Sequence, residues 1–511
     1  MAAPGRAAQP IDVETAETDE TDETDETAET DDVQAVDIET LAGPAPGSRL
    51  DLVDRVTRDR PRVETVPTCV SYSARLSPRP EFARWSVEAV TGGAALADHE
   101  QARKAAIGEA VERFCGNVVP DTLPVASYAQ LVRAGRPAVD PREFALYSRS
   151  QYAHRGFPFV PMTRELPIAW VTGHDPDDEG DEVLVPASLA YVNYFRGARA
   201  AEPPTNYPVL AGTAAGTSRE QAQRSALEEV LERDAVTLWW TSGAPAARLD
   251  PDPAPHGPLA AALGEADAAG LTVTFLRIPS TVGALVAGVF IEDRARGLVA
   301  FGSACRAAAP TAAAKAFTEA LGMHESGLEL LEHDSGFWRA VRAGRADHRP
   351  YRPLRRDRAY LKDFRPDWHD VNDVRLHLQV HLDPAMQDAG LDRLRAPGTP
   401  RPEAAPDAPG PADAPGPADA PGPADDLAPA ALRRRLAEAG MRTIAVDLTT
   451  PHVRAAGLHV ARVIVPGLYC NAPAAFPFLG GRRLYEEPAA RGWLPGPLTE
   501  EDLVRRPLPF S

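Results

Sequence analysis

Cysteine is scarce in this sequence, and long apolar runs are absent. The four cysteines among the 511 residues lie far apart, without a Cys-x-x-Cys pair or a zinc-type spacing. No segment approaches the ~18 consecutive apolar residues of a membrane-spanning helix, and the N-terminus has no apolar signal-peptide core. We therefore expect a protein of the reducing cytoplasm, with no membrane association and with cysteines that serve as small buried hydrophobic residues.

Familiar signatures of nucleotide-binding and hydrolytic enzymes are also missing. The sequence contains no GxxxxGK[ST] loop, no set of protein-kinase motifs, no GxSxG and no HExxH. Its 12 histidines are dispersed. These absences exclude a P-loop nucleotidase, a protein kinase, an α/β-hydrolase and a zincin protease, so any nucleotide site must have another architecture.

A basic surface is not expected either. Residues 1–48 contain 14 acidic residues and one arginine, so this segment carries −13 of the formal net charge of −19. The remaining −6 is ordinary for a chain of this length. The sequence therefore offers neither the positive field that nucleic acids require nor a polybasic helix for a membrane surface.

Low-complexity segments divide the chain. Residues 14–32 consist almost only of Thr, Asp and Glu, which favours a disordered, solubilising tail over an interaction tail. Residues 407–424 are three copies of DAPGPA, which is typical of a semi-extended linker. The segment after the linker is short and is better interpreted as the return of an interrupted domain. The predicted parts are a tail at 1–48, a first domain part at 49–395, a linker at 396–426 and a second domain part at 427–511.

Strand and helix patterns alternate along the globular parts. Short apolar runs predict strands, and segments of helical periodicity predict helices. This alternation indicates a mixed α/β fold. The predicted strands are 271–278, 283–292, 298–305, 374–382, 442–448 and 459–467, and the predicted helices are 218–240, 310–332 and 427–439, with a short helix-like PHVRAAG at 451–457.

Two segments, 106–114 and 226–234, repeat one pattern of paired carboxylates. Residues at i and i+3 share one face of a helix, and both segments are rich in helix-forming residues. If the two helices meet, four carboxylates converge, and such a cluster is stable only with cations; Mg²⁺ prefers oxygen ligands. Each pattern has two glutamates followed by arginine: Glu109, Glu112 and Arg113 in the first, and Glu229, Glu232 and Arg233 in the second.

A third segment, 316–324, keeps half of this pattern. It has Glu319, but Gly322 stands where the second glutamate would be, and Lys315 lies on the same helical face four residues before Glu319. Three amphipathic helices with solvated Glu/Arg pairs would also produce these patterns. The repetition of the full pattern favours the site over that interpretation.

The loop before the second segment favours a phosphate. Residues 212–217 are small, and Ser218 followed by Gln221 has capping-box spacing, so Ser218 is the predicted N-cap. Free amides at a helix start attract anions. Gln221, Ser225, Glu229 and Glu232 form one polar stripe on the helix. The block predicts a nucleotide–Mg²⁺ site, although capping alone would explain Gln221.

Four long segments resemble the YcaO family, the ATP-dependent enzymes that modify peptide backbones. The similar segments occur in the family's order and cover most of residues 60–511. They are 91–116, 206–240, 301–321 and 447–488.

This resemblance implies a single large domain and a set of site residues. It implies that Mg²⁺ ions bridging the ATP phosphates are held by Glu109, Glu112, Glu229 and Glu232. Arg233 and Lys315 are implied as catalytic, with Arg233 supporting phosphates or carboxylates and Lys315 at a position where the family often has a phosphate-contacting arginine. The resemblance assigns the remaining nucleotide-binding positions to Thr217, Ser218, Gln221, Arg113 and Glu319.

This chain also departs from the family's pattern. Gln221 stands where glutamate is usual, Thr217 where asparagine or a similar polar residue is usual, and His452 where aspartate is common. Azoline-forming members often end in a proline-rich tail near the active site, and the ending PLPFS at 507–511 matches it in part.

The implied activity is that of a cyclodehydratase acting on a ribosomal precursor peptide. ATP phosphorylates an amide oxygen while a Cys, Ser or Thr of the substrate attacks the carbonyl, which gives a thiazoline or oxazoline. A thioamide-forming enzyme that uses external sulfide and a degenerate scaffold subunit remain alternatives, the latter because of Gln221 and Thr217. No segment is left for a docking module, so we expect a separate leader-binding partner. The precursor, the ring type and the oligomeric state, including a homodimer, stay open.

Overall fold

Three antiparallel sheets form the framework of the computed structural model, which describes residues 51–60, 65–78, 90–344, 351–388, 390–398 and 428–510. These residues all belong to one unit, 36–511. The first sheet has the order β1 (Val53–Arg58), β2 (Cys69–Leu76), β3 (Val90–Leu96). The second has the order β11 (Leu298–Cys305), β10 (Val286–Asp293), β9 (Leu271–Ile278), β8 (Ala247–Arg248). The third has the order β4 (Val125–Ala126), β5 (Ile168–Asp175), β12 (Ile444–Asp447), β13 (His459–Ile464), β7 (Thr213–Gly216), with β6 (Asp178–Pro186) paired to β5.

Helices connect and cover these sheets, so the predicted mixed α/β fold is confirmed. Within the described ranges, no helix has both the length and the apolar character needed to span a membrane. The α-helices are α3 (His99–Asn117), α4 (Tyr128–Arg133), α5 (Arg149–Ala153), α6 (Ala187–Ala190), α7 (Arg219–Ser242), α8 (Pro258–Ala268), α9 (Ala309–Leu331), α10 (Gly336–Arg342), α11 (Arg375–Val380), α12 (Pro384–Gln387), α13 (Asp392–Arg395), α14 (Pro429–Glu438), α15 (Pro451–Ala455) and α16 (Arg483–Ala490).

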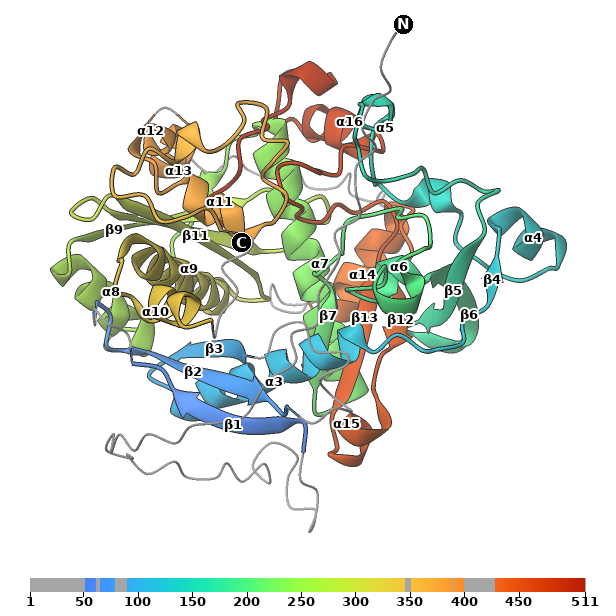
Figure 1. The fold of residues 1–511 in the computed structure, drawn as a ribbon, viewed down its shortest axis with the longest axis horizontal. Coiled ribbons are helices and arrows are strands. Elements are labelled where there is room, and N and C mark those ends of the chain that lie inside the picture. The colour runs from blue at the N-terminus through green and yellow to red at the C-terminus, as the bar shows by residue number, and fades with distance from the viewer. Residues whose placement is uncertain are drawn as a thin grey trace, which may run out of the picture. The chain divides into compact units, whose positions relative to one another are not determined.

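The long helix α7 lies between the second and third sheets, where it packs against β11 on one side and β7 and β13 on the other (Figure 1). Helix α3 packs on β2 and β3 and also contacts β7, while α9 packs on β10 and β11. The three helices that carry the glutamate patterns therefore meet around the ends of the sheets.

Two glycines allow α3 and α9 to approach their sheets closely. A Cβ atom on Gly93 of β3 would lie 2.1 Å from the backbone nitrogen of Ala106, and one on Gly302 of β11 would lie 2.3 Å from that of Ala320. Any side chain at these positions would push the helix away from the sheet. Backbone contact at these points places the two helices close to α7.

The segment after the predicted linker completes a sheet that begins before it. Strands β12 and β13 lie between β5 and β7 in the third sheet, and Val460 pairs with Ala215 of β7. This pairing is what an interrupted domain requires. The domain boundaries stay a prediction, because the tail at 1–48 and nearly all of the linker lie outside the described residues.

Most predicted elements are present, but the strand predicted at 374–382 is wrong. This segment contains the short helix α11, Arg375–Val380. Apolar residues alternate here, yet every residue from Leu376 to Leu382 is buried. The alternation therefore does not separate a buried face from a solvated one. The polar Gln379 instead bonds the backbone of Arg352 in both directions, at 2.7 and 2.8 Å.

Candidate active site

The predicted glutamates of α3 and α7 come together at the meeting point of the helices. Burial and then the charge of Glu109 raise the pKa of Glu112 well above its usual value, and the charge of Glu229 adds to this effect. Burial also raises the pKa of Glu229, with contributions from Glu232 and Glu109. Carboxylates on two helices therefore lie close enough to oppose each other's ionisation.

Backbone amides of the loop before α7 hold two of these glutamates. The amide of Ala215 donates to Oε1 of Glu112 at 2.7 Å, and the amide of Gly212 donates to Oε2 of Glu229 at 2.8 Å. Gly212 has φ +90°, a conformation that favours glycine. The small-residue loop thus orients carboxylates from two helices by its main chain.

The end of β11 holds the third carboxylate. The hydroxyl of Ser303 donates to Oε1 of Glu232 at 2.8 Å, and the amide of Cys305 donates to Oε2 at 3.3 Å. Burial raises the pKa of Glu232, and the guanidinium of Arg233 opposes this shift. Glu232 is buried, so its charge depends on these neighbours.

Arg233 stands beside the two glutamates of its own helix. Its Nε lies 3.6 Å from Oε1 of Glu232 and 3.9 Å from Oε1 of Glu229, and among the described residues neither Nε nor Nη1 has a hydrogen-bond partner. Arg113, its counterpart on α3, donates through Nε to Oε1 of Glu109 at 2.7 Å. Arg233 therefore faces two carboxylates at ion-pair distance without a hydrogen bond from Nε or Nη1, whereas Arg113 donates to a carboxylate.

Helix α9 adds the third side of the site. Lys315 bonds Glu319 across one helical turn, and burial of Glu319 is outweighed by the charge of Lys315, so that its pKa lies below its usual value. Coulombic repulsion from Glu319 in turn raises the pKa of Glu232. The structure thus joins Lys315 and Glu319 to the carboxylates of α7.

Arg306 is a cation of this site that sequence reasoning missed. Its Nη1 lies 3.1 Å from Oε2 of Glu228 on α7, and its charge acts on Glu232, Lys315 and Glu319. A single arginine after a strand has no local signature. Only its position directly after β11 marks it, since α9 begins three residues later.

Ser218 is the N-cap of α7, as predicted, and accepts from the amide of Gln221 at 3.2 Å. The capping box is only partly formed, because Oε1 of Gln221 accepts from the amide and hydroxyl of Thr217, both at 2.8 Å, instead of from Ser218. Among the described residues, no hydrogen bond joins these three residues to the glutamates. Their role in nucleotide binding stays a prediction.

The carboxylate oxygens of these glutamates are suitable ligands for Mg²⁺, although they do not converge on a single point. Among the described residues, no group of three or more His, Cys, Asp or Glu side chains is arranged to hold one metal ion. Each buried glutamate is instead held by an amide, a hydroxyl or an arginine. Buried carboxylates whose pKa is raised by mutual repulsion are the environment that a hard divalent cation would stabilise.

Comparison with known proteins identifies the family. The family model "YcaO cyclodehydratase, ATP- and Mg²⁺-binding" matches residues 93–469, which is more than half of the chain. No curated protein sequence matches the chain significantly.

Solved heterocyclases have a similar fold. A heterocyclase in complex with substrate and cofactor is similar with a TM-score of 0.59 and 19% identity, over 90% of this chain and 55% of that one. The heterocyclase TruD is similar with a TM-score of 0.51 and 20% identity, over 80% of this chain and 50% of that one. The chain spans about half the length of these two proteins.

One chain of a complex from E. coli also has a similar fold. The microcin synthetase McbBCD complex with pro-MccB17 bound contains a chain similar with a TM-score of 0.50 and 10% identity, over 81% of this chain and 88% of that one. At these identities the likeness concerns the fold, whereas the family model rests on the sequence. The predictions of the fold and of ATP and Mg²⁺ as the family's ligands are confirmed, and the chain belongs to the YcaO family.

Proposed function

We propose that the protein is an ATP-dependent cyclodehydratase that converts Cys, Ser or Thr residues of a ribosomal precursor peptide into azolines. The observation that carries this proposal is the cluster of glutamates from α3 and α7 beside Arg233, whose Nε and Nη1 have no hydrogen-bond partner. A site that combines oxygen ligands with unpaired donors suits a metal-bound polyphosphate. The chain's membership of a cyclodehydratase family supports the same activity.

The chemistry explains why no nucleophile is needed in this chain. An amide oxygen is a poor leaving group, and bound Mg·ATP supplies a phosphoryl group that turns this oxygen into phosphate. The attacking Cys, Ser or Thr belongs to the peptide. The protein contributes positioning and charge neutralisation, which is the usual mode of phosphoryl transfer.

Each side chain has a defined place in this scheme. Glu109, Glu112, Glu229 and Glu232 would hold Mg²⁺ through their carboxylate oxygens. Arg233, Lys315 and Arg306 would offset negative charge on the phosphates, with Arg113 keeping Glu109 in place. Thr217, Ser218 and Gln221 would present the N-terminus of α7 to the nucleotide.

A peptide substrate and a partner protein complete the proposal. Two of the similar structures are described as a heterocyclase with substrate and as a synthetase complex with a bound precursor. We infer that this chain likewise acts on a precursor peptide and that a separate protein binds its leader. In this proposal, the second protein brings the precursor peptide to the site by holding its leader.

Mass spectrometry of the product tests the proposal. The purified chain is incubated with Mg·ATP, a precursor peptide and a leader-binding partner. Cyclodehydration is expected to remove one water per ring with consumption of ATP. Exchange of oxygen for sulfur in the presence of sulfide would instead establish thioamide formation, and absence of ATP turnover with all components would establish a scaffold subunit.

A further inference from the structure

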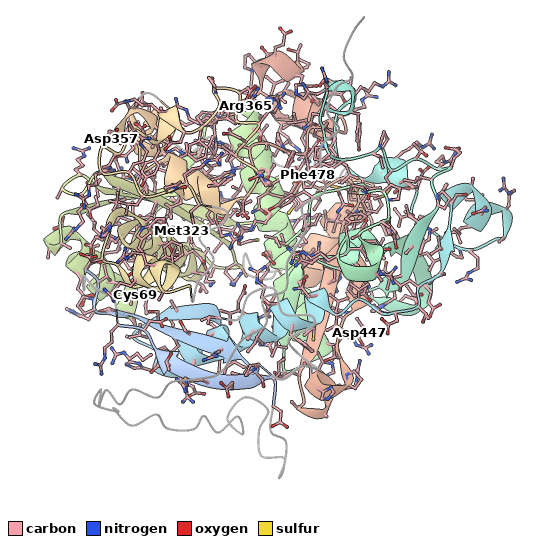
Figure 2. All side chains as sticks on the ribbon, in the orientation of Figure 1. Cys69, Met323, Asp357, Arg365, Asp447 and Phe478 are labelled. Carbon is pink, nitrogen blue, oxygen red and sulfur yellow. The ribbon has the colours of Figure 1, made fainter. Side chains whose placement is uncertain are left out.

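A small cavity lies on the side of α7 that faces β13. Its volume is about 70 Å³, and Val230 and Arg233 of α7 form one wall. Arg462 on β13, Cys470 and Phe478 also line it, and Phe478 is labelled beside α7 in Figure 2. The other lining residues are mainly apolar. Arg233 belongs to both this cavity and the carboxylate cluster.

Arg462 is a buried cation without a carboxylate partner. It is only 2% exposed, and its Nη1 donates to the hydroxyl of Thr213 at 3.0 Å and to the carbonyl of Leu210 at 3.3 Å. Its Nε has no hydrogen-bond partner, and burial lowers its pKa to about 10. An unpaired charge at such a site is costly unless negative charge compensates it.

Among the described residues, no carboxylate lines the cavity. The titratable acids of the lining are Cys470 and Tyr469. The Cys470 thiol donates to Oδ1 of Asn471 at 3.3 Å, and burial raises the pKa of both groups, so both stay neutral. The charge of Glu229 attracts Arg462, and Oε2 of Glu229 accepts from the amide of Gly212. Two guanidiniums thus face an apolar space next to the phosphoryl-transfer site.

The volume of the cavity and its hydrogen-bond donors limit which anions can bind there. A space of about 70 Å³ corresponds to a few water molecules, because each needs roughly 10–15 Å³ by the same measure. A nucleotide does not fit. A phosphate dianion would bury many acceptor positions against apolar walls, where only three nitrogen atoms of the two arginines lack a hydrogen-bond partner among the described residues. A large, monovalent anion with few hydrogen-bond requirements suits the cavity better, and arginine stabilises thiolates.

We propose that this cavity binds the sulfur nucleophile of the reaction as its anion, between Arg233 and Arg462. The inference rests on the proposed function. The ligand is a sulfur anion, and it is either the thiolate of a cysteine in the precursor peptide or free hydrosulfide. The cavity would therefore favour sulfur over the hydroxyls of Ser and Thr, which carry no charge at neutral pH.

The position of the cavity suits the reaction. Sulfur attacks the carbonyl carbon, a C–S bond forms, and the C=O electron pair moves onto oxygen. That oxygen accepts the γ-phosphoryl group of ATP with loss of ADP. The C–O bond then breaks as phosphate leaves, and loss of the amide proton gives the thiazoline; with hydrosulfide, loss of the S–H proton gives the thioamide. Arg233 borders both the cavity, where the sulfur anion would lie, and the carboxylates, where Mg·ATP would lie.

A binding experiment without nucleotide tests the cavity directly. The full chain is melted under anaerobic conditions in sodium hydrosulfide, and separately in sodium chloride and sodium phosphate at equal ionic strength. Hydrosulfide is expected to raise the melting temperature, and Arg462→Met is expected to remove the rise. Arg434→Met, at an exposed arginine of α14, is the matched control and should keep it. If Arg462→Met fails to fold, Arg462→Lys keeps the charge without the planar fork and should show a smaller rise.

A turnover experiment measures selectivity. Two precursors that differ only in Cys or Ser at the modified position are processed with partner and Mg·ATP. Arg462→Met is expected to lower kcat/KM for the cysteine peptide at least tenfold and to change that for the serine peptide less than threefold. Product mass then distinguishes a ring from a thioamide and so identifies the source of the sulfur.

Three results would overturn the proposal. These are an equal rise with phosphate that also depends on Arg462, no rise with hydrosulfide, and equal losses for both peptides. If neither peptide is processed and ATP is not consumed, the proposed function fails, while the melting experiment still decides whether the cavity binds a sulfur anion.

Discussion

The guanidinium of Arg233 lies over the ring of Phe510, 4.4 Å from its centre. The last residues of the chain therefore reach the candidate active site. The carbonyl of Pro509 accepts from the amide of Phe301 at 2.9 Å, and the carbonyl of Pro507 lies 2.8 Å from Nε2 of His381. Phe301 lies on β11, the strand that also carries Ser303. These contacts therefore fix the segment that holds the Phe510 ring against the guanidinium.

Replacement of Phe510 is expected to impair the site without unfolding the protein. A buried cation–π contact contributes about 2 kcal/mol, so Phe510→Leu should lower kcat/KM for ATP turnover roughly tenfold to thirtyfold. Phe510→Tyr keeps the aromatic face and is the matched control. Steady-state kinetics beside a melting curve would check this, and equal turnover by the Leu and Tyr variants would contradict it.

Neutralising one glutamate of α7 should abolish ATP turnover but not lower stability in the absence of Mg²⁺. Glu229→Gln or Glu232→Gln removes one of several charges that repel each other. Each variant should melt no lower than the parent without Mg²⁺ and should lose the rise caused by Mg·ATP. Glu100→Gln, at an exposed position of α3, should behave like the parent. A Glu229 or Glu232 variant with full turnover would disprove the assignment.

Stability should fall in acid because of His381. Burial lowers its pKa to about 3, so the folded state keeps it neutral, whereas the unfolded chain binds a proton below about pH 6.5. The contribution of His381 is thus complete above pH 6.5 and decreases by roughly 1.4 kcal/mol per pH unit until about pH 3. Denaturant unfolding between pH 7 and 4.5 should show a smaller slope in His381→Gln, and an unchanged slope would contradict this origin.

The acidic tail and the linker should be dispensable for the chemistry. Deletion of residues 1–48, and replacement of 396–426 by a short Gly/Ser linker that keeps Gly398, should leave ATP affinity near that of the parent. The composition of both segments disfavours a packed element, and among their described residues Gly398 alone bonds the backbone of Ala246 and Arg248. Titration calorimetry with Mg·ATP measures this affinity. A loss greater than about tenfold, or 1.4 kcal/mol, would show that one segment contributes to the site.

Peptide processing should depend on a second protein. The chain alone should hydrolyse ATP slowly and modify little peptide, since tethering by a leader-binding partner raises the local concentration of the core peptide. Addition of the partner should increase processing by orders of magnitude, and a leaderless peptide is the control. Full-rate modification by the chain alone would contradict this dependence.

The sequence by itself determined the helices and the faces that carry the glutamates. Spacing of i and i+3 is a local property of a helix, so Glu109 and Glu112, and likewise Glu229 and Glu232, could be paired before any fold was known. The cap at Ser218 is equally local. The local pattern gave a wrong prediction at 374–382. The apolar residues alternate there, but the segment is buried on all sides, so the alternation does not indicate a strand.

Tertiary structure decided which distant groups surround the glutamates, beyond the local pairs such as Lys315 and Glu319. Arg306, Arg462 and the ring of Phe510 lie far in the sequence from the glutamates and have no distinctive local pattern. Packing of β11 and β13 against α7 brings them to the site, and a charge taken out of water acquires its partners from whatever the fold places beside it. The glutamates of the site could therefore be identified from the local helical spacing, whereas their environment depends on contacts between distant segments.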